Sequence, residues 1–289
     1  MTLAELRGLL GARLPDPIAL NCVLEEVMSA PRSQLIVQGA REVTDEEFRQ
    51  ALELVDSVVA GVPLQHVIGH WTFRTLELAV DRRALIPRPE TEMVVSVALE
   101  ELHRLAGFRP LPLRCLDLGT GTGAIALSLV SEFPDVWVVA TDASREALAL
   151  ADENRSQLAA PLRDRLEIRH GDWYGALAAS SGGESLVVPF DLICANPPYL
   201  SEAEWSEVDS LVRDYDPVEA LVAGAVGTEQ IELILAGASR HLMAGGSLVI
   251  EIGWKQGPDA MRLATSAGAG YVAVLPDLAG RDRILLARF

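Results

Sequence analysis

Four residues with unusual chemistry, Asn196-Pro197-Pro198-Tyr199, directly follow the apolar run 190–195. An apolar run of this length predicts a buried strand. Two consecutive prolines cannot continue the hydrogen-bond ladder of a sheet, so we expect the chain to leave the strand as a stiff, extended turn. The turn would present its side chains at the carboxyl end of a strand, which is the edge where open α/β sheets bind ligands.

The residue types in this turn suit recognition of a planar NH2 group. Asn196 offers a carbonyl acceptor, and the backbone carbonyls around Pro197 offer others without a competing proline N–H. Tyr199 supplies an aromatic face on which a planar group can stack. Such a site would hold a conjugated amine or amide with its nitrogen directed at an electrophile. Positioning of this kind lowers a reaction barrier without a histidine or cysteine nucleophile.

A second segment, Gly119-Thr120-Gly121-Thr122-Gly123, joins a predicted strand at 113–118 to a predicted helix at 124–130. Strand, glycine turn and helix in this order are typical of nucleotide-binding crossovers, in which glycines allow the backbone to approach the ligand. The spacing is G-x-G-x-G and differs from the G-x-G-x-x-G of dinucleotide-binding enzymes. This difference argues against a pyrophosphate ligand.

Two residues that follow the next predicted strands extend this site. Asp142 ends the strand pattern 136–141, at the position where a carboxylate accepts hydrogen bonds from ribose hydroxyls. Trp173 follows the strand pattern 166–170, where an indole could flank an adenine. The alternatives are that Asp142 caps the next helix and that Trp173 is a core residue.

The order of these elements resembles that of the class I S-adenosylmethionine-dependent methyltransferases. Two further strand patterns, 271–276 and 283–289, are separated by a link that is too short for a parallel crossover. They are therefore expected to form a terminal antiparallel hairpin. The resemblance implies a Rossmann-like α/β domain with a seven-stranded, mostly parallel sheet, and S-adenosylmethionine as the cofactor.

The N-terminal part shows a different, helical pattern. Leucines recur at helical spacing from Leu3 to Leu14, and Thr44-Asp45-Glu46-Glu47 matches a capping box that opens a later helix. We expect a small helical domain over 1–70 and a connector with a β-hairpin over 71–88. The methyltransferase domain would then cover 89–289.

The chain is strongly acidic, with a formal net charge of −17. Because unspecific nucleic-acid binding needs a positively charged surface, we do not expect DNA or RNA as the direct substrate. The three cysteines and five histidines show no metal-ligand spacing, so no metal is expected. The absence of a long apolar run or signal-peptide pattern predicts a soluble, cytoplasmic protein without membrane contact.

The identity of the methylated nitrogen depends on other segments, since the tetrapeptide at Asn196 resembles those of enzymes acting on adenine, guanine or glutamine. Pro63-Leu64-Gln65-His66-Val67-Ile68-Gly69 and Leu85-Ile86-Pro87-Arg88-Pro89-Glu90-Thr91-Glu92 resemble segments of the release-factor glutamine methyltransferases, the PrmC/HemK family. The later segments Tyr215-Asp216-Pro217 and Glu251-Ile252-Gly253 resemble that family's motifs as well.

The resemblance implies that the substrate is the glutamine side-chain amide in the Gly-Gly-Gln motif of peptide-chain release factors, methylated at N5. It also implies a role for each segment. Gly119 to Gly123 would hold the methionine portion of S-adenosylmethionine, Asp142 the ribose and Trp173 the adenine, with S-adenosylhomocysteine as product. Asn196 would border the cofactor and, with Pro197, Pro198 and Tyr199, bind the substrate amide. The helical N-terminal domain would recognise the release factor.

Arg88 and Glu90 are charged residues on a stiff segment between or beside prolines, and two roles are open for them. They would act in catalysis, or they would form a structural salt bridge that locks the connector. Glu251, at a strand end, would touch the substrate or cap the next segment of the chain, and we favour the structural role.

Two other functions compete with glutamine methylation. The first is an adenine or guanine N-methyltransferase acting on nucleic acid, which would need a basic groove. The second is a sensor or scaffold that binds S-adenosylmethionine without turnover. A sensor would have no use for the paired acceptors at Asn196 and Pro197.

Overall fold

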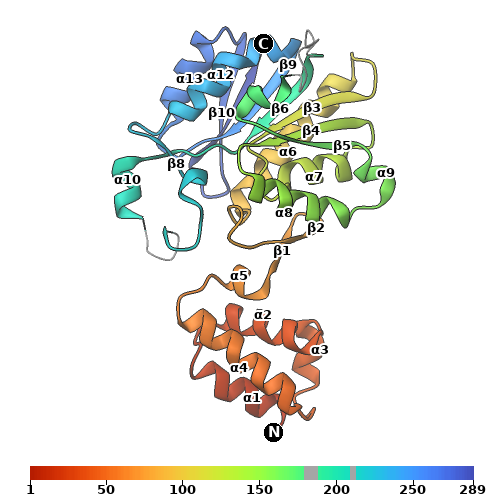
Figure 1. The fold of residues 1–289 in the computed structure, drawn as a ribbon, viewed down its shortest axis with the longest axis vertical. Helices are drawn as coiled ribbons and strands as arrows, with labels where there is room; N and C mark the ends of the chain where they lie inside the picture. Colours follow the sequence, from red (N-terminus) through yellow and green to blue (C-terminus); the bar gives the residue numbers. More distant parts are fainter. Residues whose placement is uncertain (179–187, 209–212) are drawn as a thin grey trace. The chain divides into compact units, whose positions relative to one another are not determined.

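The computed structural model describes residues 1–178, 188–208 and 213–289 (Figure 1). By its internal contacts the chain divides into two compact units. The first is Met1–Trp71 with Ser210–Tyr215, and the second is Thr72–Asp209 with Asp216–Phe289. The segment that we expect to be a connector, 71–88, therefore belongs by its contacts almost wholly to the second unit.

The first unit contains five helices within 1–71: α1 (Leu3–Gly11), α2 (Pro17–Met28), α3 (Arg32–Val37), α4 (Asp45–Val59) and α5 (Leu64–Ile68). Leu3, Leu6 and Leu10 are fully buried on one face of α1, as their helical spacing predicts. The predicted capping box is present, because the Thr44 side chain accepts from the Glu47 N–H while the Glu47 side chain accepts from the Thr44 N–H.

The second unit is built on a seven-stranded sheet with the order β10-β11-β9-β6-β3-β4-β5. The strands are β3 (Leu113–Leu118), β4 (Val136–Asp142), β5 (Leu166–His170), β6 (Phe190–Ala195), β9 (Leu242–Glu251), β10 (Tyr271–Pro276) and β11 (Asp282–Arg288). Neighbouring pairs from β9 to β5 are parallel, whereas β11 is antiparallel to both β9 and β10. The predicted sheet and its terminal hairpin are thereby confirmed.

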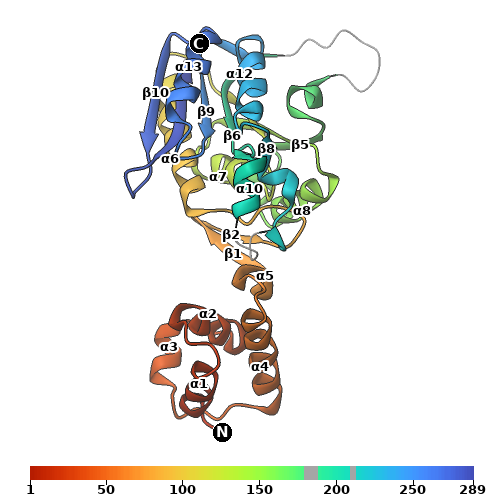
Figure 2. The ribbon, with the colours of Figure 1, turned by 90° about the vertical axis from the view of Figure 1, so that its left-hand side faces the viewer.

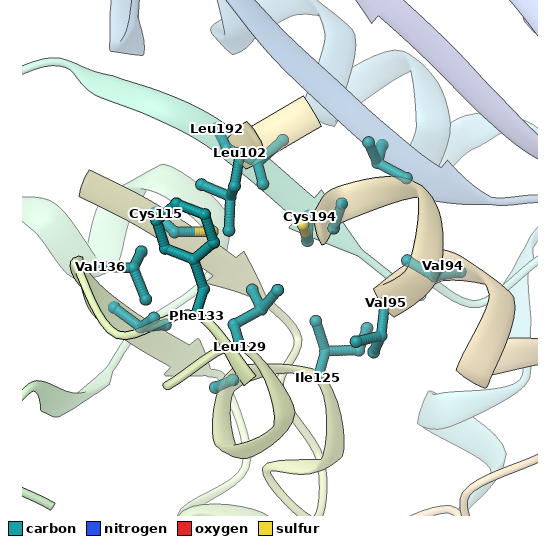
Figure 3. Close-up of a cluster of buried hydrophobic side chains, with 14 of the residues drawn as sticks. Val94, Val95, Leu102, Cys115, Ile125, Leu129, Phe133, Val136, Leu192 and Cys194 are labelled. Carbon is teal, nitrogen blue, oxygen red and sulfur yellow. The ribbon is translucent and has the colours of Figure 1, made fainter. Parts of the chain in front are cut away.

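Helices cover both faces of this sheet (Figure 2). α6 (Pro89–Ala106) and α7 (Ala124–Glu132) pack on one face, and α12 (Glu229–His241) and α13 (Gly257–Ser266) pack on the other. Alternate strand residues serve the two cores, so that Cys115 and Leu192 face α6 and α7 while Leu116 and Ile193 face α12 and α13. Figure 3 shows the first of these cores, where Leu102 lies among side chains of β3, β6 and α7.

Shorter elements surround the sheet. They are β1 (His70–Phe73), β2 (Leu76–Ala79), α8 (Arg145–Ser156), α9 (Ala160–Arg163), η1 (Trp173–Leu177), β7 (Leu200–Ser201), α10 (Glu202–Glu207), η2 (Val218–Ala220) and β8 (Val222–Gly224). β1 and β2 pair with each other, and so do β7 and β8. No helix in the described parts of the chain combines the length and apolar character needed to cross a membrane.

One side chain ties the β1–β2 hairpin to the glycine segment. Asn154 of α8 accepts from the Ala79 N–H at 2.7 Å and donates to the Ala79 carbonyl at 3.1 Å. Its amide also donates to the Thr122 carbonyl at 2.9 Å. Asn154 is 3% exposed, so these bonds replace its lost hydration and hold the end of β2 to the glycine segment.

Candidate functional site

A cavity of about 760 Å³ lies at the carboxyl ends of β3, β4, β5 and β6. This volume falls within the range of small-molecule sites, roughly 300–1,000 Å³. The predicted site residues that line the cavity are Gly119, Thr120, Gly121, Thr122, Asp142, Trp173, Asn196 and Pro198. Of the remaining predicted residues, Gly123, Pro197 and Tyr199 do not form its wall. The glycine turn and the Asn-Pro-Pro-Tyr turn, which are far apart in sequence, thus border one space.

The glycine turn has a backbone conformation that residues with side chains rarely adopt. Gly119 has φ +69, and a Cβ built on it would lie 3.4 Å from Cζ3 of the Trp173 ring. Gly121 has φ +56, and its N–H donates to Asp142 Oδ2 at 2.9 Å. The turn is therefore held in a left-handed conformation that favours glycine, with its bare backbone beside the cavity.

Asp117, the second-last residue of β3, holds this turn through hydrogen bonds. It was not among the site residues predicted from the sequence. The fully buried carboxylate accepts from Thr120 Oγ1 at 2.6 Å and from the Ala126 N–H at 3.2 Å. Burial raises the pKa of Asp117 to about 7. The signal in the sequence is an acid in the mostly apolar strand Leu113–Leu118, two residues before the first glycine of the turn.

Asp142 ends β4 and uses both carboxylate oxygens on the backbone. Oδ2 accepts from Gly121, and Oδ1 accepts from the Ser144 N–H at 2.9 Å. Burial raises the pKa of this carboxyl, while the backbone donors oppose the shift. The N-cap of α8 is Ser144, whose side chain accepts from Ala147, so Asp142 is not the cap of that helix.

Trp173 begins η1 with φ 39, an uncommon conformation for a residue with a side chain. Its ring lines the cavity and also packs against the core beneath α12. The indole Nε1 donates to Gln230 Oε1 at 3.0 Å, and Gln230 lines the cavity too. Trp173 therefore belongs both to the core and to the cavity wall, and its contact with an adenine stays a prediction.

The turn after β6 is anchored on its far side by Gln256. The Gln256 amide nitrogen donates to the Tyr199 carbonyl at 2.9 Å and to the Gly227 carbonyl at 2.8 Å. Its oxygen accepts from the Gly253 N–H at 2.8 Å. Burial, followed by the nearby charge of Glu251, raises the pKa of the Tyr199 phenol, which favours its neutral form.

The segment that opens α6 also reaches this site. Arg88 forms an ion pair with Asp216 at 2.7 Å, and the Asp216 side chain is only 3% exposed. Neither Arg88 nor Glu90 lines the cavity, whereas Thr91 does. Among the residues of the described ranges, no group of three or more histidine, cysteine, aspartate or glutamate side chains is placed to hold a metal ion.

Comparison with known proteins relates the chain to methyltransferases in both of its parts. The family model of the PrmC N-terminal domain matches residues 8–69, and that of the methyltransferase small domain matches residues 102–214. The chain is 39% identical to a release factor glutamine methyltransferase of Deinococcus radiodurans, over 96% of this chain and 93% of that protein. It is 36% identical to a release factor glutamine methyltransferase of Escherichia coli, over 92% and 90% of the two chains.

Among solved structures, the chain is similar in fold to the catalytic domain of hMettl16, crystallised with an RNA hairpin. The TM-score is 0.53 with 15% sequence identity, covering 84% of this chain and 82% of that one. This likeness concerns the methyltransferase fold alone.

Proposed function

The chain belongs to the release factor glutamine methyltransferase family, and we propose that it methylates N5 of the glutamine in the Gly-Gly-Gln motif of peptide-chain release factors. It is an S-adenosylmethionine-dependent methyltransferase. The observation that carries the proposal is the shared cavity, in which the carboxamide of Asn196 lies at the same sheet edge as the glycine turn.

The cofactor's contribution is an electrophilic methyl group on a sulfonium sulfur. The wall of the cavity carries groups that could bind each part of S-adenosylmethionine. The backbone of Gly119 to Thr122 would hold the methionine portion, with Gly123 ending the turn at the start of α7. The Asp142 carboxylate would accept from the ribose hydroxyls, and the ring of Trp173 would contact the adenine.

A glutamine amide is a poor nucleophile because its nitrogen lone pair is delocalised into the carbonyl. Asn196 Oδ1 and the backbone carbonyl of Pro197 would accept its two N–H groups and direct the nitrogen at the methyl group. Pro198 forms the adjacent wall, and the Tyr199 ring would pack behind the amide plane. The proton would leave to water during or after transfer, with S-adenosylhomocysteine as the second product.

The partner in this proposal is the release factor itself, and the N-terminal unit would recognise it. An acidic enzyme, with a formal net charge of −17, is a poor match for direct contact with nucleic acid. A cytoplasmic location forms part of the same proposal, since the substrate is a translation factor. Arg88 would then serve as a structural ion-pair partner of Asp216, and we assign no catalytic step to Glu90.

The class of substrate can be tested with methyl-labelled S-adenosylmethionine and a mixture of release factor, transfer RNA and DNA. We expect label that protease treatment releases and nuclease treatment leaves in place. Nuclease-sensitive label would support the nucleic-acid methyltransferase instead. Cofactor binding by calorimetry without any label transfer would support the sensor.

A further inference from the structure

A buried chain of hydrogen bonds lies behind Asn196. The Thr91 hydroxyl donates to Glu251 Oε2 at 2.7 Å, and Asn196 Nδ2 donates to Thr91 Oγ1 at 3.1 Å. Thr91 is 4% exposed and Glu251 1% exposed. Three separate elements meet here, because Thr91 lies in the first turn of α6, Glu251 ends β9 and Asn196 follows β6.

The sheet register explains why these residues meet. β6 and β9 are parallel neighbours, and Ala195 is paired with Ile250. The residues that follow this pair are Asn196 and Glu251, so their side chains lie near each other at the carboxyl edge of the sheet. The first turn of α6 then places the Thr91 hydroxyl between them.

The available donors and acceptors fix the direction of these hydrogen bonds. An ionised carboxylate has acceptors only, so Glu251 requires Thr91 to donate its single hydroxyl proton. Thr91 Oγ1 can then only accept from Asn196, and only the NH2 end of the Asn196 carboxamide can donate to it. The carboxamide oxygen is left for a group bound in the cavity, which Asn196 lines.

We propose that Thr91 and Glu251 are positioning residues that fix the orientation of the Asn196 carboxamide, with its nitrogen toward Thr91 and its oxygen toward the substrate amide. The inference rests on the proposed function and deepens it. An amide in the opposite orientation would present N–H donors to a substrate that has N–H groups to donate. We call Glu251, Thr91 and Asn196 with their two hydrogen bonds the relay. The relay thus favours a ligand that donates amide N–H groups over a ligand that offers an acceptor at this point.

Protonation of Glu251 reverses the relay. A protonated Glu251 donates to Thr91, and Thr91 then donates to the carboxamide oxygen, which turns the NH2 group toward the cavity. Burial raises the pKa of Glu251 to about 7, with Glu90 acting in the same direction and Thr91, Arg283 and Arg88 opposing it. The neighbouring Tyr199 is held neutral over this range. The orienting form of the relay therefore predominates above pH 7 and is lost below it.

The test compares kcat, KM and cofactor affinity of the intact enzyme with three variants. Thr91→Val keeps the shape of the side chain without the hydroxyl, and we expect kcat for the release factor to fall roughly tenfold or more, with little change in cofactor affinity. Thr91→Ser restores a hydroxyl and should recover much of the lost rate. Ser128→Ala removes another buried hydroxyl, which donates to Ala124 within α7, and serves as the control for lost stability.

Glu251→Gln tests the relay through the pH dependence of kcat, which would not change if Glu251 had a structural role only. A glutamine side chain can donate or accept, so it no longer dictates the direction of the relay. We expect a lower kcat that no longer falls as the pH drops through about 7, whereas the wild type keeps that fall. Ser128→Ala should retain the wild-type profile.

The outcomes separate the inference from the function on which it rests. No methylation of the release factor by the wild type would overturn both. Methylation by the wild type, with equal kcat in Thr91→Val and Thr91→Ser, would overturn the relay alone. If Thr91→Val fails to fold, Thr91→Ser and Glu251→Gln still decide, because a wild-type kcat and pH profile in both variants would contradict the relay.

Discussion

The carboxamide of Asn196 reaches the cavity because β6 ends one residue before it and two prolines prevent the backbone from continuing the sheet. At the residue scale, the types and order of the site residues were predictable from the sequence. The partners that orient them were not. Thr91 and Glu251 lie 105 and 55 positions from Asn196. The strand register brings Glu251 to Asn196, and the packing of α6 brings Thr91 to both.

Replacement of Asn196 by alanine removes the proposed acceptor for the substrate amide. Asn196→Ala is expected to lower kcat by about a hundredfold or more, of the order of 3 kcal/mol in the barrier. Cofactor affinity should change much less, because the glycine turn and Asp142 are untouched. Steady-state kinetics with a release factor, alongside calorimetry with the cofactor, measures both effects. Near-normal turnover would exclude the amide-holding role.

Asp142 serves the glycine turn through its bond with Gly121 and would serve the ribose as well. Asp142→Ala is therefore expected to weaken cofactor binding by tenfold or more, roughly 1.4 kcal/mol. Thr44→Ala is the control, since it removes the N-cap of α4 at a residue that does not line the cavity and should lower stability without a comparable effect on the cofactor. Equal cofactor affinity in the wild type and Asp142→Ala would leave Asp142 with a structural role only.

At the element scale, local patterns predicted the strand, glycine turn and helix over 113–132, and the short link predicted the β10–β11 hairpin. The pairing of β7 with β8 was not predicted, because both strands are very short and carry no alternating pattern. The contact between η1 and α12 was likewise hidden, since it depends on one glycine far along the chain.

Gly237 in α12 makes room for Tyr174 of η1. A Cβ at Gly237 would lie 2.2 Å from Cε2 of the Tyr174 ring. The ring is held by stacking on His241 at 4.2 Å and by its hydroxyl, which donates to the Ile234 carbonyl at 2.8 Å. Gly237→Ala is therefore expected to lower the free energy of unfolding by about 1–3 kcal/mol.

The matched control for this packing is Gly175→Ala, one residue after Tyr174. Gly175 is exposed, and a Cβ there would meet nothing within 4 Å. Its free energy of unfolding should stay within about 0.5 kcal/mol of the wild type. Chemical denaturation of both variants tests the contact. Equal free energies of unfolding would show that the Tyr174 ring moves aside without loss of stability.

At the scale of the whole molecule, the site places two buried carboxyls at one edge of the sheet. Burial raises the pKa of Asp117 and of Glu251, each to about 7, from 3.8 and 4.5. Because the folded state binds these protons more tightly than the unfolded state, their stabilising contribution is present below pH 4 and is lost as the pH rises toward 7. An acid in an apolar strand signals such a group, although its pKa follows from burial that only the fold supplies.

Carboxyls with a lowered pKa, such as Glu101, make the protein more stable as the pH rises, which masks the opposite effect of Asp117. A comparison of the wild type with Asp117→Asn isolates the contribution of Asp117, because all other carboxyls are the same in both proteins. Between pH 4 and 8 the wild type should lose stability relative to Asp117→Asn, by an amount of the order of 4 kcal/mol. Urea denaturation at several pH values measures the difference. Parallel stability curves for the two proteins would mean that the Asp117 carboxyl is ionised throughout.

The proposed function requires that the methyl group is transferred to one side-chain nitrogen of a protein. The most direct measurement incubates the enzyme with methyl-labelled S-adenosylmethionine and a release factor, then locates the label by peptide mass spectrometry. We expect label on the side chain of the Gly-Gly-Gln glutamine, and none when that glutamine is replaced. Label on another residue, or label that survives the replacement, would contradict glutamine methylation.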